Sequence, residues 1–96
     1  MGGVFNTPDI RITVREIMGT GNPPCEYEPG DSWVVTDMGS PAGLCTWAIA
    51  SMSPYLATLR FGGSMPWEDD KDRAVVCCSD AANPVVFELR RLAAES

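Results

Sequence analysis

The chain has 96 residues, a formal net charge of -6 at pH 7 and no histidine. Its seven basic residues are scattered rather than clustered, which argues against nucleic acid and anionic membrane surfaces as partners. Since imidazole is absent, thiols and carboxylates must supply most of any reactive centre. The length suits one small domain, which we expect over residues 10–96 after an N-terminal extension over residues 1–9.

The first third of the chain predicts two strands. Residues 10–18 alternate apolar and polar side chains, as in a strand with one buried face. A segment rich in glycine and proline, residues 19–24, then leads to Cys25. Residues 28–31 have the proline and glycine of a tight turn, and residues 32–36 form a second apolar strand.

Two short helices are expected next. Over residues 44–52 apolar side chains recur every three or four residues, which matches one face of a helix. Ser53–Pro54 is typical of an N-cap followed by proline at the first helical position. A second helix is therefore expected over residues 54–61, with Gly62–Gly63 as its terminator.

The last third predicts an acidic loop and a hairpin. Residues 68–72 are expected to form a solvent-exposed acidic segment rather than a cation site. Residues 73–78 and 84–92 are short apolar strands, and the turn-rich residues between them are few enough for a hairpin. The order of elements predicts an α+β fold, a small antiparallel sheet of about four strands with two short helices inserted between the strand pairs.

Several spaced motifs resemble a family of small prokaryotic proteins known mainly as uncharacterised. They are Gly-x-Cys-x-Trp-Ala over residues 43–48, Gly-Gly followed by Pro-Trp over residues 62–67, and Cys-Cys-Ser-Asp followed by Asn-Pro-Val-Val-Phe over residues 77–87. The resemblance covers nearly the whole chain beyond Ile10, although Ser79 stands where the family usually has proline. It implies no particular reaction, but it singles out as positions of interest Cys25, Cys45, Cys77, Cys78 and Asp80.

The positions of the cysteines favour an enzyme. Cys25 and Cys45 lie in or beside loops rich in glycine and proline, where functional groups tend to sit, and the first turn of a helix at Cys45 would favour a thiolate. Such a thiol, near a second thiol and a carboxylate, suits proton transfer, nucleophilic attack or disulfide exchange. We expect an isomerase or a decarboxylase-type lyase acting on a small organic substrate, with no cofactor. Its expected catalytic residues are Cys25, Cys45, Cys78 and Asp80.

Aromatic side chains are the expected walls of the substrate pocket. Trp33, Trp47, Trp67 and Tyr55 suit a largely apolar cavity. Among them Trp47 and Trp67 are the expected substrate-binding residues. Ordinary core packing is the alternative for each aromatic residue.

Two other functions stay open. A thiolate metal or redox protein would hold zinc or an iron–sulfur cluster through Cys25, Cys45, Cys77 and Cys78. The chain lacks a Cys-x-x-Cys pair, and adjacent residues of a strand point to opposite faces, which argues against all four cysteines as ligands. The other alternative is a non-catalytic binding subunit, in which some of the cysteines are buried apolar side chains.

The expected surroundings of the protein are cytoplasmic. Residues 1–10 lack the basic leader and apolar stretch of a secretion signal, and no segment approaches the ~20 apolar residues that span a bilayer. In the cytoplasm free or metal-bound thiols are expected rather than lasting disulfides. Because so small a domain buries a modest fraction of its surface, we also expect a homo-oligomer.

Overall fold

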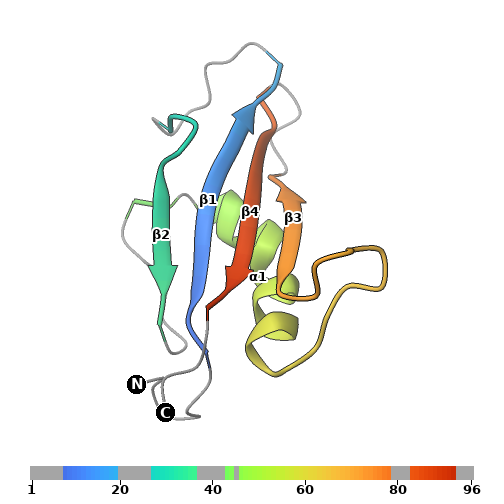
Figure 1. Cartoon of the computed structure of the whole chain (residues 1–96). Coiled ribbons are helices and arrows are strands. Elements are labelled where there is room, and N and C mark those ends of the chain that lie inside the picture. The colour runs from blue at the N-terminus through green and yellow to red at the C-terminus, as the bar shows by residue number, and fades with distance from the viewer. Residues whose placement is uncertain (1–7, 20–26, 37–42, 45, 79–82, 93–96) are drawn as a thin grey trace.

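The computed structural model describes residues 8–19, 27–36, 43–44, 46–78 and 83–92 (Figure 1). Its elements in chain order are β1 (Ile10–Ile17), β2 (Ser32–Val35), α1 (Thr46–Arg60), β3 (Arg73–Cys77) and β4 (Val85–Arg91). The four strands form one antiparallel sheet in the order β2-β1-β4-β3, and α1 covers one face of it. The predicted α+β class with a four-stranded antiparallel sheet is confirmed.

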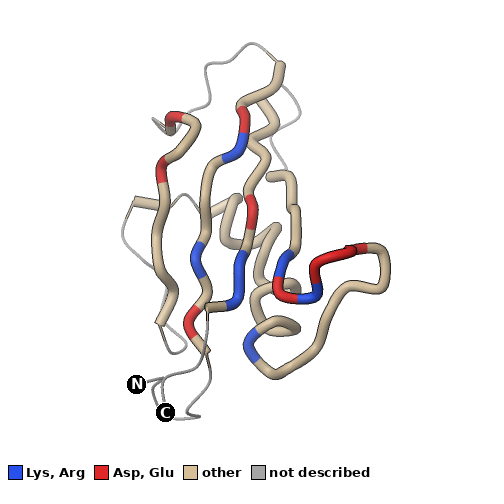
Figure 2. The backbone as a smooth tube through the Cα atoms, viewed as in Figure 1, with Lys and Arg blue, Asp and Glu red and all other residues tan. Residues whose placement is uncertain are grey.

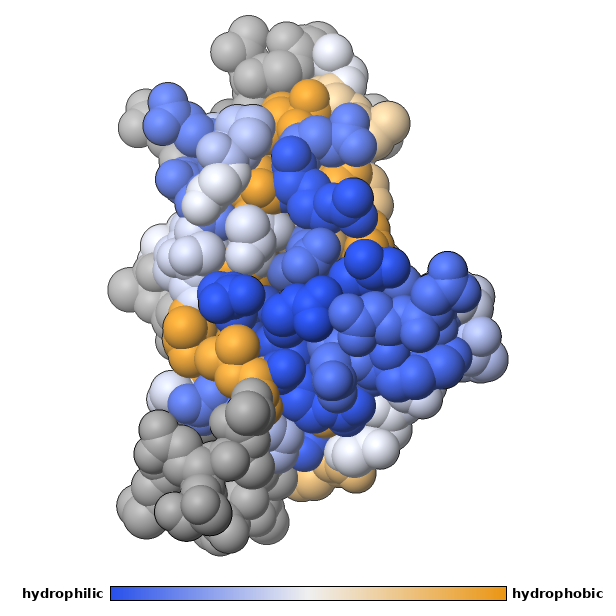
Figure 3. All heavy atoms as spheres, viewed as in Figure 1, coloured by the Kyte–Doolittle hydropathy of each residue, from blue (hydrophilic) through white to orange (hydrophobic). Residues whose placement is uncertain are grey.

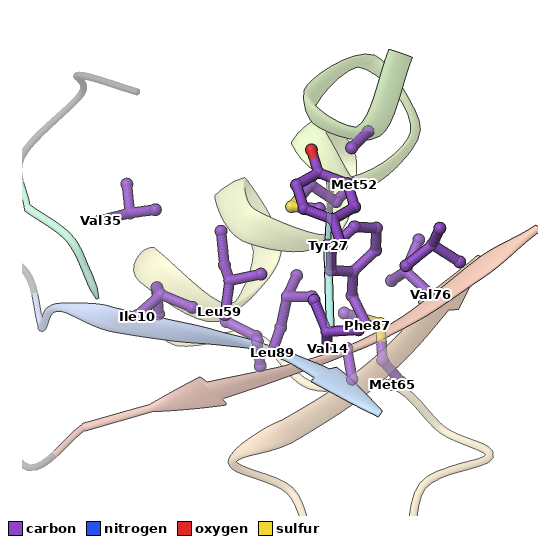
Figure 4. Packing of buried hydrophobic residues seen from close by; sticks show 14 residues of the cluster. Ile10, Val14, Tyr27, Val35, Met52, Leu59, Met65, Val76, Phe87 and Leu89 are labelled. Atoms are coloured by element: carbon purple, nitrogen blue, oxygen red, sulfur yellow. The ribbon is translucent and has the colours of Figure 1, made fainter. Parts of the chain in front are cut away.

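The core lies between the sheet and α1 (Figure 4). Alternation along β1 directs Ile12 and Val14 inward, opposite Leu89 and Phe87 of β4, and all four side chains are fully buried. Each such side chain contributes about 1.5–3 kcal/mol by leaving water. The complete buried apolar set is Ile10, Ile12, Val14, Tyr27, Val35, Ala48, Met52, Leu59, Met65, Ala74, Val76, Val85, Phe87 and Leu89.

A bulge interrupts the pairing of β1 with β4. The register shifts between Val14 and Glu16, so β1 has one more residue than β4 at this point. The extra residue reverses the alternation beyond it and brings Ile17 opposite the buried Val85. Ile17 therefore packs against the core, although it follows Ile10 by an odd number of residues.

The structure has one helix where the sequence predicts two, so the two-helix prediction is wrong. Pro54 lies inside α1 instead of starting a second helix. The φ angle of proline suits a helix, and the bond lost with its N–H is the one to the carbonyl of Ala50, on the solvent side. Both halves of α1 bury the same face, with Met52 before the proline and Leu59 after it. Packing on the sheet thus keeps the helix continuous.

The end of α1 at Gly62–Gly63 is confirmed. The Gly63 N–H donates to the Thr58 carbonyl at 2.8 Å and the Gly62 N–H to the Leu59 carbonyl at 3.4 Å, the two bonds of a Schellman motif. Gly62 has a φ of 89°, an angle that residues other than glycine rarely adopt. A Cβ on Gly63 would lie 2.8 Å from Cγ2 of Thr58. Both glycines are therefore required for this tight turn.

Glu68 corrects the prediction of a solvent-exposed acidic loop. It is only 8% exposed, and its Oε1 accepts hydrogen bonds from Nε and Nη2 of Arg73 at 3.2 and 3.1 Å. Its Oε2 accepts the backbone N–H of Val75 at 3.1 Å. Since β3 is an edge strand, this carboxylate covers a donor that another chain could otherwise pair with.

The rest of the acidic segment is fastened to the end of β4, and Figure 2 shows the acidic and basic residues side by side there. Arg90 donates to Asp70 at 2.8 Å, and Nε of Arg91 donates to Asp72 at 2.9 Å. Nη1 of Arg91 also donates to the carbonyls of Leu59 and Gly63, each at 2.9 Å. One guanidinium therefore ties the end of α1 and the acidic segment to the sheet.

Replacement of Pro54 by alanine tests the continuity of α1. We expect Pro54→Ala to raise the free energy of unfolding by about 1–3 kcal/mol, because alanine restores the N–H and favours the helix. Urea denaturation followed by circular dichroism measures it. Pro66→Ala, at an exposed proline outside the helix, is the control and should change stability by less than about 1 kcal/mol. A loss of stability in Pro54→Ala would contradict the continuous helix.

Asp70 predicts a dependence of stability on pH. The backbone N–H of Asp72 and the guanidinium of Arg90 lower the pKa of Asp70 from its ordinary value of 3.8. A carboxyl whose pKa is lowered on folding stabilises the fold above its ordinary pKa, and this contribution is lost as pH falls through the lowered value. We expect Asp70→Asn to be less stable than the wild type at pH 7, with the difference shrinking as the pH falls below 3.8 and vanishing below the lowered pKa of Asp70.

Asp69→Asn is the matched control, because Asp69 is exposed and makes no ion pair within the described part of the chain. Urea denaturation at a series of pH values measures how far the free energy of unfolding of each variant differs from that of the wild type. Equal effects of the two substitutions would show that general charge repulsion, rather than the contact with Arg90, is the cause.

Candidate functional site

Only part of the predicted catalytic set lies within the described residues. Cys25, Cys45 and Asp80 lie outside them. Cys78, the fourth predicted catalytic residue, is described, as are Cys77 and the two tryptophans predicted to bind substrate. The site is therefore built from Cys78 outward.

Cys78 directly follows β3 and is held against the start of β4. Its backbone N–H donates to the carbonyl of Val85 at 3.0 Å. Its Sγ accepts the N–H of Val85 at 3.2 Å and, as a thiol, donates to the carbonyl of Asn83 at 3.9 Å. The side chain is half-buried and packs against the core. The Val85 N–H can therefore donate to the Cys78 sulfur in both the thiol and the thiolate form.

Cys77 lies on the other face of the sheet. Strand alternation directs it away from α1, and it is exposed, whereas Cys78 packs against the core. Partial desolvation, with a smaller contribution from the neighbouring Cys78, raises the pKa of the Cys77 thiol above its ordinary value of 9.0. Because the thiolate is the nucleophile, Cys77 is poorly suited to attack at neutral pH.

An aromatic cluster lies in the core near Cys78. The ring of Tyr27 meets that of Phe87 edge to face at 5.8 Å, and it meets that of Trp33 at 5.4 Å. Phe87 belongs to β4, two residues beyond the Val85 that holds Cys78. Gly43 lies against Trp33, since a Cβ at Gly43 would be 3.2 Å from the indole Nε1. The cluster joins β2, β4 and two loop residues at this part of the core.

Tyr27 is the member of this cluster that sequence reasoning missed. It lies between two glutamates in a segment without apolar periodicity, so pattern alone gives no sign of its burial. The one feature of the sequence that could have indicated the role of Tyr27 is its position, two residues after Cys25 and six before Trp33. Trp33, predicted as a possible pocket wall, is half-buried and packs against the core.

Trp47 and Trp67 are the predicted substrate-binding residues, and both are largely exposed, at 59% and 67%. Trp47 lies in the first turn of α1 and Trp67 in the loop before the buried Glu68. Neither belongs to the core cluster against which Cys78 packs. Their role in substrate binding stays a prediction.

The face of the sheet opposite α1 is mainly hydrophilic (Figure 3). Arg11, Arg90 and Arg73 lie opposite one another on β1, β4 and β3. Glu68 pairs with Arg73 at 3.1 Å and Asp70 with Arg90 at 2.8 Å, so acidic residues neutralise two of the three. This face therefore carries balanced charge rather than a basic patch.

The metal alternative has few described residues to draw on. Over residues 8–19, 27–36, 43–44, 46–78 and 83–92, no three His, Cys, Asp or Glu side chains group closely enough to hold a metal ion. Cys77 and Cys78 point to opposite faces, so a single centre could use one of them without distortion of β3. Which residues would complete such a centre depends on Cys25 and Cys45, outside the described ranges.

Comparison with models of known families, with curated proteins and with solved structures finds no match to this chain. The resemblance drawn from the sequence motifs accordingly stays a prediction. No helix among the described residues is long and apolar enough to cross a membrane.

The raised pKa of Cys77 predicts a slow reaction with alkylating reagents. We expect its rate of reaction with iodoacetamide to keep rising as the pH passes 9.0, because the thiolate fraction is still incomplete there. Tandem mass spectrometry separates Cys77 from Cys78. The protein unfolded in urea is the control. In it, the pH at which the alkylation rate of Cys77 is half-maximal should return to the ordinary range for a thiol. The prediction would be contradicted if the alkylation rate of Cys77 in the folded protein reached half its maximum at or below pH 9.0.

Proposed function

We propose that the protein is a thiol-dependent enzyme that carries out proton transfer on a small organic substrate, with Cys78 as its acid–base residue. The observation that carries the proposal is the pair of hydrogen bonds on the Cys78 sulfur. The sulfur accepts the Val85 N–H at 3.2 Å and donates to the Asn83 carbonyl at 3.9 Å. A group with a partner in each protonation state suits a role in which it takes up and returns a proton.

The proposed reaction is proton transfer at carbon, which the partners of the Cys78 sulfur support. The thiolate removes a proton from carbon next to a carbonyl group, which leaves an enolate and a neutral thiol. The thiol returns its proton to a carbon of the enolate, so atoms and electrons balance without an added oxidant or reductant. This describes an isomerase, and protonation of a carbanion left by loss of carbon dioxide would describe a decarboxylase-type lyase. Cys25, Cys45 and Asp80 remain the proposed partners of Cys78.

The absence of histidine makes a thiol the natural choice for this role. No imidazole is present, so thiols and carboxylates are the groups left for acid–base work near neutral pH. Of the two adjacent cysteines, Cys77 is the weaker candidate because its pKa is raised by desolvation. Cys78 has the fixed backbone donor and the contact with the core.

Hydrogen exchange at carbon tests the proposal. The protein is incubated in D2O with a panel of small oxo acids and ketones, and proton NMR follows the loss of C–H signals. We expect exchange of at least one compound, a reduction of about a hundredfold or more in Cys78→Ser, and little change in Cys77→Ser. The two substitutions are adjacent and chemically identical, so Cys77→Ser is the matched control. Equal rates in Cys78→Ser and the wild type would exclude Cys78 as the acid–base residue.

A thiolate metal or redox centre is the second candidate, and the same hydrogen bond favours it. Backbone N–H groups that donate to sulfur commonly stabilise thiolates bound to zinc or iron–sulfur clusters. Elemental analysis of protein purified without chelator separates the two candidates. Stoichiometric zinc or iron that is lost in Cys78→Ser would favour the metal protein, and metal-free protein that exchanges substrate protons would favour the enzyme.

A further inference from the structure

We propose that the substrate of Cys78 is an uncharged carbonyl compound, a ketone or a keto ester, and not a free keto acid. The proposal rests on the proton-transfer function proposed for Cys78 and names the substrate class for it. It favours the isomerase over the decarboxylase-type lyase, because a decarboxylase acts on a carboxylate. The observations that carry it are the apolar side chains near Cys78 and the positions of the basic residues.

Cys78 lies in the last row of inward side chains at one end of the sheet. Val85 is opposite Ile17 of β1, and on its other side it exchanges hydrogen bonds with Cys78. All three side chains lie on the core side, under α1. The next inward row is also buried and consists of Val14, Phe87 and Val76. Among the described residues, a substrate that reaches the Cys78 sulfur along this face therefore meets hydrocarbon and aromatic surfaces.

The basic residues of the core side lie at the opposite end of the sheet. All seven lysine and arginine residues of the chain fall within the described ranges, so each of them can be placed. Arg60 donates to the carbonyl that ends β2, at 3.2 Å, and Arg91 lies opposite Ile10. Ile10 and Ile17 are about 23 Å apart along β1. Since an ion pair needs a distance of about 4 Å, neither guanidinium can hold a carboxylate at Cys78.

The remaining five basic residues are Arg11, Arg15, Lys71, Arg73 and Arg90. Most basic residues gather toward the end of the sheet at which β3 begins (Figure 2). Lys71 is held there by two carbonyls of its own loop, at 3.2 and 2.6 Å, and Arg73 is about 17 Å from Cys78 along β3. Arg15 lies nearer along the sheet, but it is exposed beyond the inward Val14 and is two strands, about 10 Å, from β3.

Charge at the Cys78 end of the sheet is mainly negative. Glu16 is exposed there, and the turn that carries Glu28 and Asp31 is bonded to Val14 through Gly30 and Asp31. The proposed reaction adds a further negative charge, because the base is a thiolate. A substrate carboxylate would thus lose water without gaining a cationic partner, and it would lie near a like charge. An uncharged carbonyl compound meets neither penalty.

The competing possibility is a free keto acid bound by backbone N–H groups, as anions are at helix N-termini. The Val85 N–H is directed at the Cys78 sulfur, so it is already engaged. The experiment therefore compares acids with esters that share the same ketone.

Hydrogen exchange of matched pairs tests the proposal. Keto acids whose carboxylate is remote from the ketone, such as levulinate, are compared with their methyl esters in D2O, and the exchange in buffer alone is subtracted. We expect the full chain to exchange the esters about tenfold or more faster than the acids. In Cys78→Ser the exchange of both should be lost. Equal or faster exchange of the acids, lost in Cys78→Ser, would overturn the substrate class and leave the proposed function standing. Exchange that is absent for both, or unchanged in Cys78→Ser, would overturn the two together.

A lysine placed beside Cys78 tests the cause of the preference. Ile17→Lys adds an ammonium group on the other side of Val85, on the same face of the sheet. We expect it to shift the ratio of ester to acid exchange about fivefold or more toward the acid. Val34→Lys is the matched control, because Val34 is 46% exposed on β2 and lies opposite Arg11, and it should leave the ratio unchanged.

Thermal unfolding followed by circular dichroism shows whether each lysine variant is folded. An unchanged ratio in folded Ile17→Lys, or an equal shift in Val34→Lys, would overturn the role given to the missing positive charge. The comparison of acids and esters in the wild type decides the substrate class even where Ile17→Lys does not fold.

Discussion

The pairing of β1 with β4 in the middle of the sheet is the constraint on which the rest of the fold depends. It joins residues more than seventy positions apart in the chain, with Ile12 opposite Leu89 and Val14 opposite Phe87. Neither the β1–β2 pair nor the β3–β4 pair would be stable alone, because a two-stranded hairpin has too little apolar surface to bury. Their union creates the apolar face on which α1 packs, and it also brings Arg91 to the end of that helix.

Sequence patterns predicted the strands well because each strand has one buried face. The alternation along β1 and the apolar runs of β3 and β4 are direct consequences of that burial. They could not reveal the bulge between Val14 and Glu16, which depends on how β1 meets a distant strand. The burial of Glu68 was likewise hidden, since its partners, Arg73 and the N–H of Val75, meet it only when the segment folds back on β3.

The candidate site was predictable only in part, for a related reason. Strand alternation correctly separates the directions of Cys77 and Cys78, but composition cannot say which of them faces the core. That choice depends on the register with β4, which sets Val76 opposite Phe87 and so directs Cys77 outward. The hydrogen bonds on the Cys78 sulfur come from Asn83 and Val85, residues recognisable in the sequence only as the end of a turn and the start of a strand.

The error over α1 follows from its composition. Apolar residues on both sides of a helix weaken the periodicity that marks a single buried face, and Pro54 in such a segment then reads as a new beginning. Met52 and Leu59 lie on the inner face, whereas the exposed Ala50, Pro54 and Ala57 make the outer face apolar as well. The irregular pattern of α1 thus has a physical origin, a helix with apolar residues on both its inner and its outer face.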